Sequence, residues 1–346
     1  MNQTARGILA AVALSLAATA VEAQTQIKVS YQPALYWSLP YYVATEKGWW
    51  GKVGLKESYS TFPAGVPQIA ASASGSWDVG GTGSVPAVLG AARYHLLTIG
   101  LTNDESVGNA LMATKDTAAG FEKNPASIKG QTIALTANST GDYAVQKCLA
   151  KWGMKKTDVT LKSMGQAEVI SAMSSNQVSL GGLWAPNIYT LEEKAGATVI
   201  CSGKDAGVVI PGALVVREDY AKKHPKEVAK YLAVYLHSWK WINAHRPEAI
   251  AMMKKFYEVG GVTISEASME KEFDRPVFDL EQHLKIMDRS HGPSQVDQWM
   301  TQISEFLKSV GTIQKVQPAK EYITDKYMKM VAADPKLKAF ADSSAD

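Results

Sequence analysis

The sequence has little of what nucleophilic, metal or nucleotide chemistry requires. Its 346 residues include only two cysteines and six dispersed histidines, and no H-E-x-x-H motif occurs. The run TGSVP has Pro86 where a G-x-S-x-G nucleophile elbow needs its second glycine, and no G-x-x-x-x-G-K-[ST] phosphate loop is present. The glycine cluster GGTGSV lacks the acidic residue that a dinucleotide site requires after the next strand. These absences argue against an enzyme, and we expect neither a metal nor a cofactor.

Excess charge and long apolar runs are also missing. The net charge of +3 is small for this length and the lysines are scattered, so we expect no nucleic-acid partner. The apolar run GILAAVALSLAATA is too short to cross a bilayer; it follows Arg6 and precedes VEA, whose small residues suit a signal peptidase. We therefore predict a signal peptide over residues 1–23, cleavage after Ala23, and export to the periplasm of a soluble mature chain.

The two cysteines, Cys148 and Cys201, both lie in the middle third of the chain. In an exported protein such a pair forms one disulfide or remains as two buried thiols. A disulfide would close one domain on itself, whereas the helical pattern around Cys148 also suits a buried helix face. The sequence leaves both alternatives open.

Expected strands alternate with expected helices through most of the mature chain. Runs such as IKVSYQ, HLLTIGLT and TIALTA read as strands, with helical periodicity between them. This alternation predicts an α/β fold with mainly parallel sheets. We expect two lobes, one at residues 24–115 plus 213–346 and the other at residues 116–212. Two strands, NALMATKD and GALVVRED, would cross between them, and a helical tail, in which residues 264–287 read as one helical segment, would cover the first lobe.

Polar or glycine-rich loops follow three of the expected strands, at the ends where open α/β sheets bind ligands. They are GGTGSV (80–85), NSTGD (138–142) and WAPN (184–187). Short polar residues in such loops either cap the next helix or, with its free amides and dipole, hold an anion. Three such loops from two lobes would line one cleft. Tyr36 and Trp37, directly after the first strand, would add an aromatic wall there or pack on their own lobe.

The chain resembles the periplasmic solute-binding proteins of ABC importers, and within them the nitrate/sulfonate/bicarbonate branch with its taurine- and alkanesulfonate-binding proteins. The resemblance rests on the order of IKVSYQP, YYVATEKGWWGKVGL, FPAGVPQIAASASGSWDVGGTGSVPAVLGAA, IKGQTIALTANSTGDYAVQKCLAKWGMKKTDVTL, WAPNIYTLEEKAG and ALVVREDYAKKHPKEV. It covers nearly the whole mature chain. It implies a two-lobed type II periplasmic binding protein fold that closes on its ligand by hinge motion, with a membrane permease as partner and an ATPase behind it.

The resemblance also implies a site, in which short polar residues and amides of the two glycine-rich loops hold the acidic head of a sulfonate. The matching positions are Gly83, Ser84, Ser139, Thr140 and Gly141, and Trp184 matches a tryptophan that shapes the pocket. We complete the set of expected ligand-binding residues with Gln32, Trp37, Glu105 and Asn187. No lysine or arginine stands at these loops, so neutral dipoles would hold the anion.

One position departs from the taurine binders that the chain resembles. They carry an acidic residue just before the second crossover strand, where it can pair with an ammonium group, and this chain has Gly212. An unpaired buried ammonium is costly, so taurine is disfavoured unless Asp104, Glu105 or Asp142 substitutes. The loop LTNDES (101–106) either faces solvent or reaches a cationic or hydroxylated part of the ligand.

From these features we expect a monomeric, non-enzymatic protein that captures a small organic anion, such as a sulfonate, and delivers it to an ABC permease. A carboxylate, a thiamine-precursor-like pyrimidine or another heterocycle are alternative ligands. An enzyme of the same fold, whose candidate thiols would be Cys148 and Cys201, is a first rival. A sensor that passes the closed state to a membrane kinase is a second.

Overall fold

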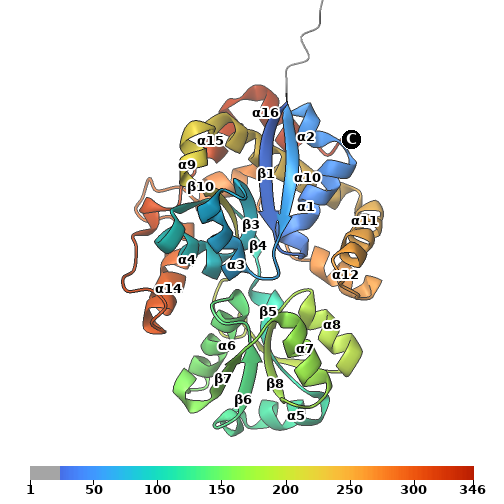
Figure 1. Ribbon diagram of the computed structural model, residues 1–346, viewed down its shortest axis with the longest axis vertical. Coiled ribbons are helices and arrows are strands. Elements are labelled where there is room, and N and C mark those ends of the chain that lie inside the picture. The colour runs from blue at the N-terminus through green and yellow to red at the C-terminus, as the bar shows by residue number, and fades with distance from the viewer. Residues whose placement is uncertain (1–23) are drawn as a thin grey trace, which may run out of the picture.

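Two five-stranded sheets lie one above the other along the long axis of the computed structural model, which describes residues 24–346 (Figure 1). The predicted signal peptide lies outside the described residues. The strand orders are β2-β1-β3-β10-β4 and β7-β6-β8-β5-β9. The predicted α/β class with two lobes is confirmed. We call the part of the chain around the first sheet lobe 1 and the part around the second sheet lobe 2. Within residues 24–346, no helix combines the length and apolar character that a membrane span needs.

Lobe 1 contains the N-terminal units and the helical tail. Its strands are β1 (Thr25–Tyr31), β2 (Leu55–Thr61), β3 (Val79–Gly83), β4 (Leu96–Asp104) and β10 (Pro211–Arg217). Its helices in the first part of the chain are α1 (Leu35–Glu46), α2 (Trp49–Lys52), α3 (Gly65–Ala71) and α4 (Ser84–Tyr94). The tail adds α9 (Glu218–Lys223), α10 (Pro225–Ala244), α11 (Arg246–Val259), α12 (Glu266–Phe273), α13 (Leu280–Ile286), α14 (Gln295–Ser309), α15 (Lys326–Ala333) and α16 (Pro335–Asp342).

Lobe 2 is smaller and is built from one continuous stretch of chain. Its strands are β5 (Asn109–Ala113), β6 (Thr132–Leu135), β7 (Thr160–Ser163), β8 (Leu180–Trp184) and β9 (Thr198–Ser202). Its helices are α5 (Lys115–Lys123), α6 (Thr140–Lys151), α7 (Gln166–Ser174) and α8 (Asn187–Ala195). Short 3₁₀ turns in the two lobes are η1 (Ser72–Ser74), η2 (Ser106–Gly108), η3 (Pro125–Ile128), η4 (Lys156–Asp158) and η5 (Ala319–Glu321).

Each sheet pairs its strands in parallel except for one strand that the chain enters from the other lobe. β1 pairs in parallel with β2 and β3, and β6 with β7 and β8. β10 runs antiparallel to β3 and β4, and β5 runs antiparallel to β8 and β9. A strand that starts at the junction between the lobes must run opposite to neighbours that end there. The carboxyl ends of the parallel strands in both sheets therefore face the junction.

The chain passes between the sheets twice, through residues 105–108 and through residues 203–210. The strands on the far side of these passages, β5 and β10, are those that the sequence marked as NALMATKD and GALVVRED. Our division of the chain after residues 115 and 212 remains a proposal. In the sheets themselves, β5 belongs to lobe 2 and β10 to lobe 1.

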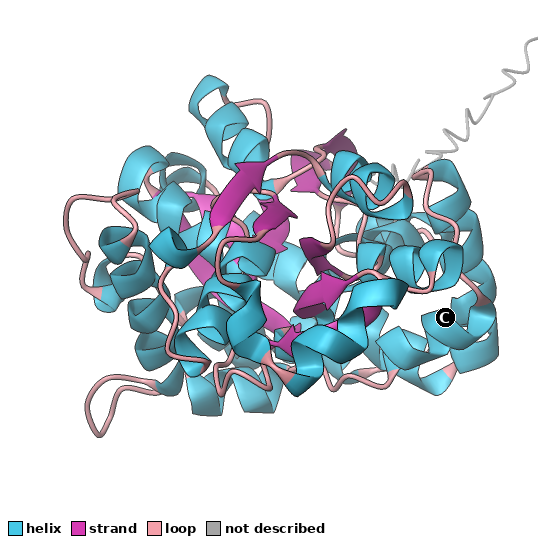
Figure 2. Cartoon of the chain, turned by 90° about the horizontal axis from the view of Figure 1, so that it is seen from below, coloured by secondary structure: helices cyan, strands magenta, loops and turns pink. Residues whose placement is uncertain are grey.

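Helices cover both sides of the strands (Figure 2), as parallel sheets require. The core of lobe 1 joins α1 to the tail, because α10 buries Tyr231, Leu232 and Tyr235 against α1 and the first sheet. This packing fixes the start of α1. Tyr36 and Trp37, which follow the first strand, lie in the first turn of that helix and are buried.

The tail departs from the sequence prediction at residues 264–287. These residues do not form one helical segment: α12 ends at Phe273, α13 begins at Leu280, and residues 274–279 connect them. Pro276 accounts for the break, because proline lacks a backbone N–H and disfavours helix at the residue before it. The residue before it is Arg275.

The two cysteines form a disulfide that joins α6 to β9 inside lobe 2. Cys148 and Cys201 are separated by 53 positions in the sequence, and both are buried. Of the two alternatives that the sequence left open, the structure contains the disulfide.

Candidate functional site

A small cavity lies between the lobes, at the carboxyl ends of the strands. Its volume is about 10 Å³, counted as the space that admits the centre of a water molecule. The lobes are therefore closed around a space for roughly one water molecule. The cavity is lined by Ala34, Leu35, Tyr36, Trp37, Glu105, Gly108, Asn109, Trp184, Ala185, Glu272 and Arg275.

Three of the expected ligand-binding residues line this cavity: Trp37 from α1, Glu105 from the first passage between the lobes, and Trp184 from the end of β8. Trp37 Nε1 donates a hydrogen bond to Oε1 of Glu105. Both side chains are buried, with 4 % of each residue exposed. The aromatic wall and the acidic loop that the sequence indicated separately thus meet at one point.

The glycine-rich loops bring two helix N-termini together beside this cavity. A Cβ atom built on Gly83, at the start of α4, would lie 2.7 Å from Cγ2 of Thr140 at the start of α6 and 3.6 Å from Cζ2 of Trp37. A Cβ atom on Gly141 would lie 3.5 Å from Cε3 of Trp184. The N-termini of one helix from each lobe therefore face each other next to the two tryptophans.

The tip of α4 has unsatisfied polar groups. Its N-cap is Gly83, which offers no side chain to cap the first turn. Ser84 is completely buried, and its Oγ has no hydrogen-bond partner in the part of the chain that the structure describes. A buried hydroxyl without a partner is unfavourable, so this one is suited to a polar group that enters the cleft.

The tip of α6 is already capped. Ser139 Oγ accepts a hydrogen bond from the amide of Asp142 at 3.1 Å and donates to the carbonyl of Thr136 at 2.7 Å. The Asp142 carboxylate accepts from the Asn138 amide and from Gln146, and burial raises its pKa. Ser139 and Asp142 thus complete the helix end itself, whereas Thr140 meets Gly83 of the other lobe and Gly141 packs against Leu183 and Trp184 of lobe 2.

Two further expected site residues, Gln32 and Asn187, belong neither to the cavity lining nor to the two helix tips. Gln32 is buried within lobe 1, where its Nε2 donates to Oε1 of Gln68 at 2.8 Å and to Oγ1 of Thr82 at 2.9 Å. It supports the end of β3, which leads to Gly83. Asn187 is the first residue of α8 and is only half-buried.

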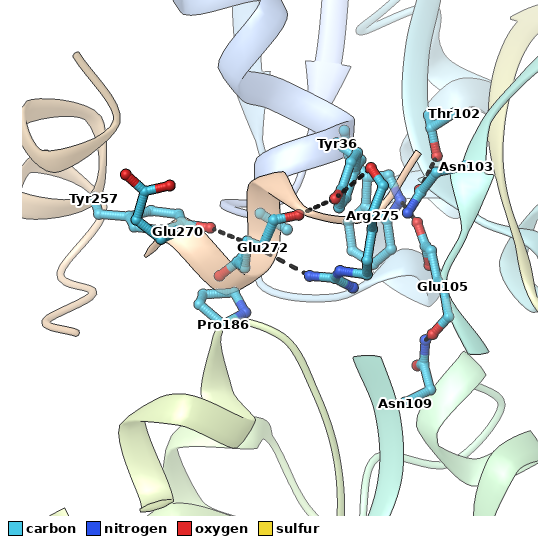
Figure 3. Close-up of polar contacts among 12 residues, drawn as sticks. Tyr36, Thr102, Asn103, Glu105, Asn109, Pro186, Tyr257, Glu270, Glu272 and Arg275 are labelled. Atoms are coloured by element: carbon cyan, nitrogen blue, oxygen red, sulfur yellow. Dashed lines mark hydrogen bonds and ion pairs between the residues drawn. The ribbon is translucent and has the colours of Figure 1, made fainter. Parts of the chain in front are cut away.

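A charged cluster that the sequence analysis missed forms one side of the cavity. Figure 3 shows Arg275 between Glu272 on one side and Glu105 on the other. The Arg275 guanidinium lies 4.9 Å from the centre of the Tyr36 ring, and its Nη2 lies 3.7 Å from Oε2 of Glu272. A basic side chain thus lines the cavity, although none stands at the two helix tips where neutral dipoles are expected to hold the anion. The sequence feature that could have indicated Arg275 is Asp-Arg-Pro, because the proline prevents α12 from continuing beyond these residues.

Burial controls the protonation of the two carboxyl groups in this cluster. It raises the pKa of Glu105 to about 8, against the lowering effects of the Trp37 hydrogen bond and the Arg275 charge. Burial also raises the pKa of Glu272 to about 7, opposed by Arg275 and by the hydrogen bond from Tyr257. In the closed state at neutral pH, Glu105 is therefore mainly protonated and Arg275 keeps a partly uncompensated charge.

Gly212 leaves the space that the Glu105 carboxyl group occupies. A Cβ atom built on Gly212 would collide with Oε1 of Glu105 and Oγ1 of Thr102. Of the three acidic residues considered as substitutes at this position, Glu105 is the one in the cavity lining. Asp104 accepts from the amides of Ser106 and Ile210 instead, which ties the two passages between the lobes together.

Further contacts join the lobes at the edges of the cleft. Glu193 of α8 accepts hydrogen bonds from the Ser265 amide and hydroxyl and from the Ser268 hydroxyl, at the start of α12. These bonds lower the pKa of Glu193. At the other edge, Thr312 donates to Oδ1 of Asn138. No group of three metal-ligating side chains is found among residues 24–346.

The sequence profile of a family described as NMT1/THI5 like matches residues 37–249. A Brucella abortus protein named as a binding protein is 26% identical over 288 residues, which are 82% of this chain and 86% of that protein. The taurine-binding periplasmic protein of Escherichia coli is 27% identical over 221 residues, 63% of this chain and 67% of that protein. Among solved structures, the periplasmic aliphatic sulphonate binding protein SsuA of Escherichia coli has a TM-score of 0.72 at 19% identity, covering 88% of this chain and 99% of that chain.

Proposed function

Because the chain belongs to the NMT1/THI5-like family, we propose that it is the substrate-binding component of an ABC importer and captures a small organic anion between its lobes. Two of the three proteins named above are described as taurine-binding and aliphatic sulphonate binding, which supports a sulfonate or a similar anion as the ligand. Delivery to a membrane permease, export to the periplasm and action as a monomer are parts of the same proposal.

The observation that carries this proposal is the meeting of the two helix tips across the cleft. The α4 tip offers the Ser84 hydroxyl, which has no hydrogen-bond partner among residues 24–346, and the α6 tip places Thr140 opposite Gly83. Amides at helix N-termini suit an anionic head group. Groups from both lobes reach the head only when the lobes are closed, so a ligand that binds them stabilises the closed form by a shift in population.

The rival functions predict different observations. An enzyme of this fold would convert its bound ligand, and Cys148 and Cys201 are not available as nucleophiles while they form a disulfide. A sensor would pass the closed form to a membrane kinase, so its neighbouring genes would encode a kinase in place of a permease. A pyrimidine or another heterocycle as ligand would stack on Trp37 or Trp184, both of which line the cavity.

The proposal is tested by a thermal-shift screen of the mature chain against sulfonates, carboxylates, ureides and pyrimidines. A ligand at a hundred times its dissociation constant adds about 2.7 kcal/mol to the stability of the folded protein. We expect sulfonates to raise the Tm and to be recovered unchanged after incubation. Stabilisation by pyrimidines alone, or turnover of the ligand, would reject the proposal.

Substitutions at the helix tips separate head-group binding from helix capping. Ser84→Ala and Thr140→Ala are each expected to weaken sulfonate binding about tenfold, because hydrogen bonds to charged groups contribute about 1.5–3 kcal/mol. Ser139→Ala is the matched control, since its hydroxyl caps α6; it is expected to lower stability by about 1 kcal/mol and to have the smaller effect on affinity. Isothermal titration calorimetry and thermal unfolding measure both effects. Unchanged affinity in the Ser84 and Thr140 variants would show that the head group binds elsewhere.

Closing of the lobes is expected to take up protons. Glu105 faces Arg275, Asp104 and Tyr36, and Glu272 faces Arg275 and Tyr257; in an open cleft both carboxyl groups would titrate near their ordinary pKa of 4.5. Because their pKa values in the closed form are about 8 and 7, the closed form binds more protons between pH 5 and 8. Protonation of these two carboxyl groups therefore stabilises the closed form at low pH. This stabilisation is lost as the pH rises through 8.

The corresponding measurement is calorimetry of ligand binding in buffers that differ in ionisation enthalpy. Near pH 7.5 we expect uptake of about one proton for each ligand bound, and affinity that falls about tenfold for each unit of pH. Glu105→Gln should reduce the uptake. Release of protons on binding would show that the ligand presents a cation to these carboxyl groups.

A further inference from the structure

We propose that Arg275 forms a second ligand subsite, so that the ligand carries a second acidic group, a carboxylate, joined by a short spacer to the head group held at the helix tips. This inference rests on the proposed function, because it assumes that an organic anion enters the cleft. It deepens that function by naming the chemistry at the other end of the ligand: a short sulfocarboxylate rather than a simple alkanesulfonate or an aminosulfonate.

The guanidinium of Arg275 is buried without adequate partners. Its side chain is 11% exposed, and its Nε and Nη2 atoms have no hydrogen-bond partner among the residues that the structure describes. The nearest carboxylate oxygen, Oε2 of Glu272, lies 3.7 Å from Nη2, which is beyond hydrogen-bond distance. A buried charge with free donors is strongly unfavourable. A carboxylate offers two acceptor oxygens in the plane that an arginine fork requires.

The charge balance of the cavity also favours an added anion over an added cation. Among the described residues, the ionisable side chains that line the cavity are Glu105, Glu272, Arg275 and the hydroxyl of Tyr36. Burial raises the pKa of both carboxyl groups, to about 8 for Glu105 and about 7 for Glu272. When they are protonated, Arg275 is the remaining charge, and a second acidic group on the ligand would neutralise it.

The chain around Arg275 brings the guanidinium close to the backbone of the first passage between the lobes. A Cβ atom built on Gly108 would collide with Nη1 of Arg275, so any larger residue at this position would displace the arginine. Asn109, the next residue, donates from Nδ2 to the carbonyl of Glu105, and its Oδ1 has no partner within residues 24–346. This free acceptor suits a protonated or hydroxylated group near the ligand's carboxylate.

The two subsites are close enough for one short ligand. Trp37 contacts both: its Nε1 donates to Glu105, and its Cζ2 lies 3.6 Å from the Cβ position of Gly83. These two atoms belong to the same edge of the indole ring, one atom apart. The helix tips and the Arg275 cluster therefore lie at neighbouring points along that edge, and a spacer of a few carbons would join groups bound at each.

The test compares three ligands that differ at one end, 3-sulfopropionate, propanesulfonate and taurine, by isothermal titration calorimetry on the mature chain. We expect 3-sulfopropionate to bind at least about tenfold more tightly than the other two, as a charge-assisted pair would give. Equal affinity for propanesulfonate, or a preference for taurine, would overturn the inference. Binding of none of these sulfonates, nor of any other organic anion, would instead reject the proposed function itself.

Variants assign the preference to Arg275. In Arg275→Gln, we expect the loss of affinity for 3-sulfopropionate to exceed the loss for propanesulfonate by about tenfold. Arg275→Lys keeps the charge but not the planar fork, and should retain part of the preference. Lys320→Gln, which removes an exposed basic side chain in η5, is the control and should leave the preference unchanged. Equal losses for both ligands in the Arg275 variants would show that the arginine only supports the fold of the cleft.

Discussion

Gly83→Val is expected to weaken ligand binding by about 10- to 100-fold, because overpacking of a close contact costs about 1–3 kcal/mol. A side chain at residue 83 would enter the gap between the lobes, where its Cβ atom would lie 2.7 Å from Cγ2 of Thr140. The lobes could then not reach the closed arrangement in which both helix tips contact the ligand. Calorimetry with the best ligand from the screen measures the loss, and small-angle scattering should show that the variant stays open when ligand is added.

Because the backbone conformation of Gly83 is one that valine can adopt, Gly83→Val should affect closure of the lobes and not folding of lobe 1. Its φ of −71° and ψ of 159° are in the extended region that valine readily adopts, so lobe 1 should fold normally. Gly83→Ala, with a smaller side chain, should give an intermediate loss. Gly120→Ala in α5 is the matched control, because within residues 24–346 no side chain and no backbone outside its own helix lies within 4 Å of its Cβ position. Full affinity in Gly83→Val would show that the contact between the two tips does not belong to the ligand-bound state.

The position of the site followed from local patterns in the sequence. Glycine-rich and polar residues after buried strands mark the carboxyl edge of a parallel sheet, and the structure brings Gly83, Thr140 and Trp184 together at that edge. Such signals are visible because a strand, a loop and the next helix are consecutive in the chain. Our assignment of these residues to ligand binding remains a proposal.

Local patterns did not distinguish the roles of neighbouring polar residues. Ser139 and Thr140 are adjacent and chemically alike, yet Ser139 caps α6 while Thr140 faces the other lobe. The difference depends on where the first turn of the helix begins, and helix ends are predicted less well than helices. In the NSTGD cluster Ser139 therefore performs the capping that the sequence offered as one alternative, and we propose the other, anion binding, for Thr140.

Arg275 escaped sequence analysis for a different reason. It lies more than 90 positions after β8, and it reaches the cleft because α10 and its neighbours pack the tail back against α1. No hydrophobic periodicity within the tail indicates that Arg275 comes close to the cleft. The local clue was Pro276, which ends α12 and leaves Arg275 in a connecting segment where a charged side chain can turn toward the cleft.

Replacement of both cysteines by alanine is expected to lower the free energy of unfolding by about 4 kcal/mol, the value for a cross-link that closes a loop of this length. Cys148 and Cys201 are 53 positions apart, and the disulfide constrains the unfolded chain of lobe 2. Chemical denaturation of the double variant, with the oxidised and the reduced wild-type protein beside it, measures the loss. The reduced wild type should lose nearly as much as the variant, since the missing bond and not the missing sulfur volume accounts for the effect.

The single variants separate a disulfide from two buried thiols. If the bond exists in solution, Cys148→Ala and Cys201→Ala each remove it completely, so either single loss should nearly equal the loss in the double variant. Two independent thiols would instead give smaller losses that add. The disulfide also ties α6, whose first residue Thr140 meets lobe 1, to β9, which pairs with the crossing strand β5. Its removal should therefore weaken ligand binding as well as stability, and protein folded in a reducing cytosol should show both defects.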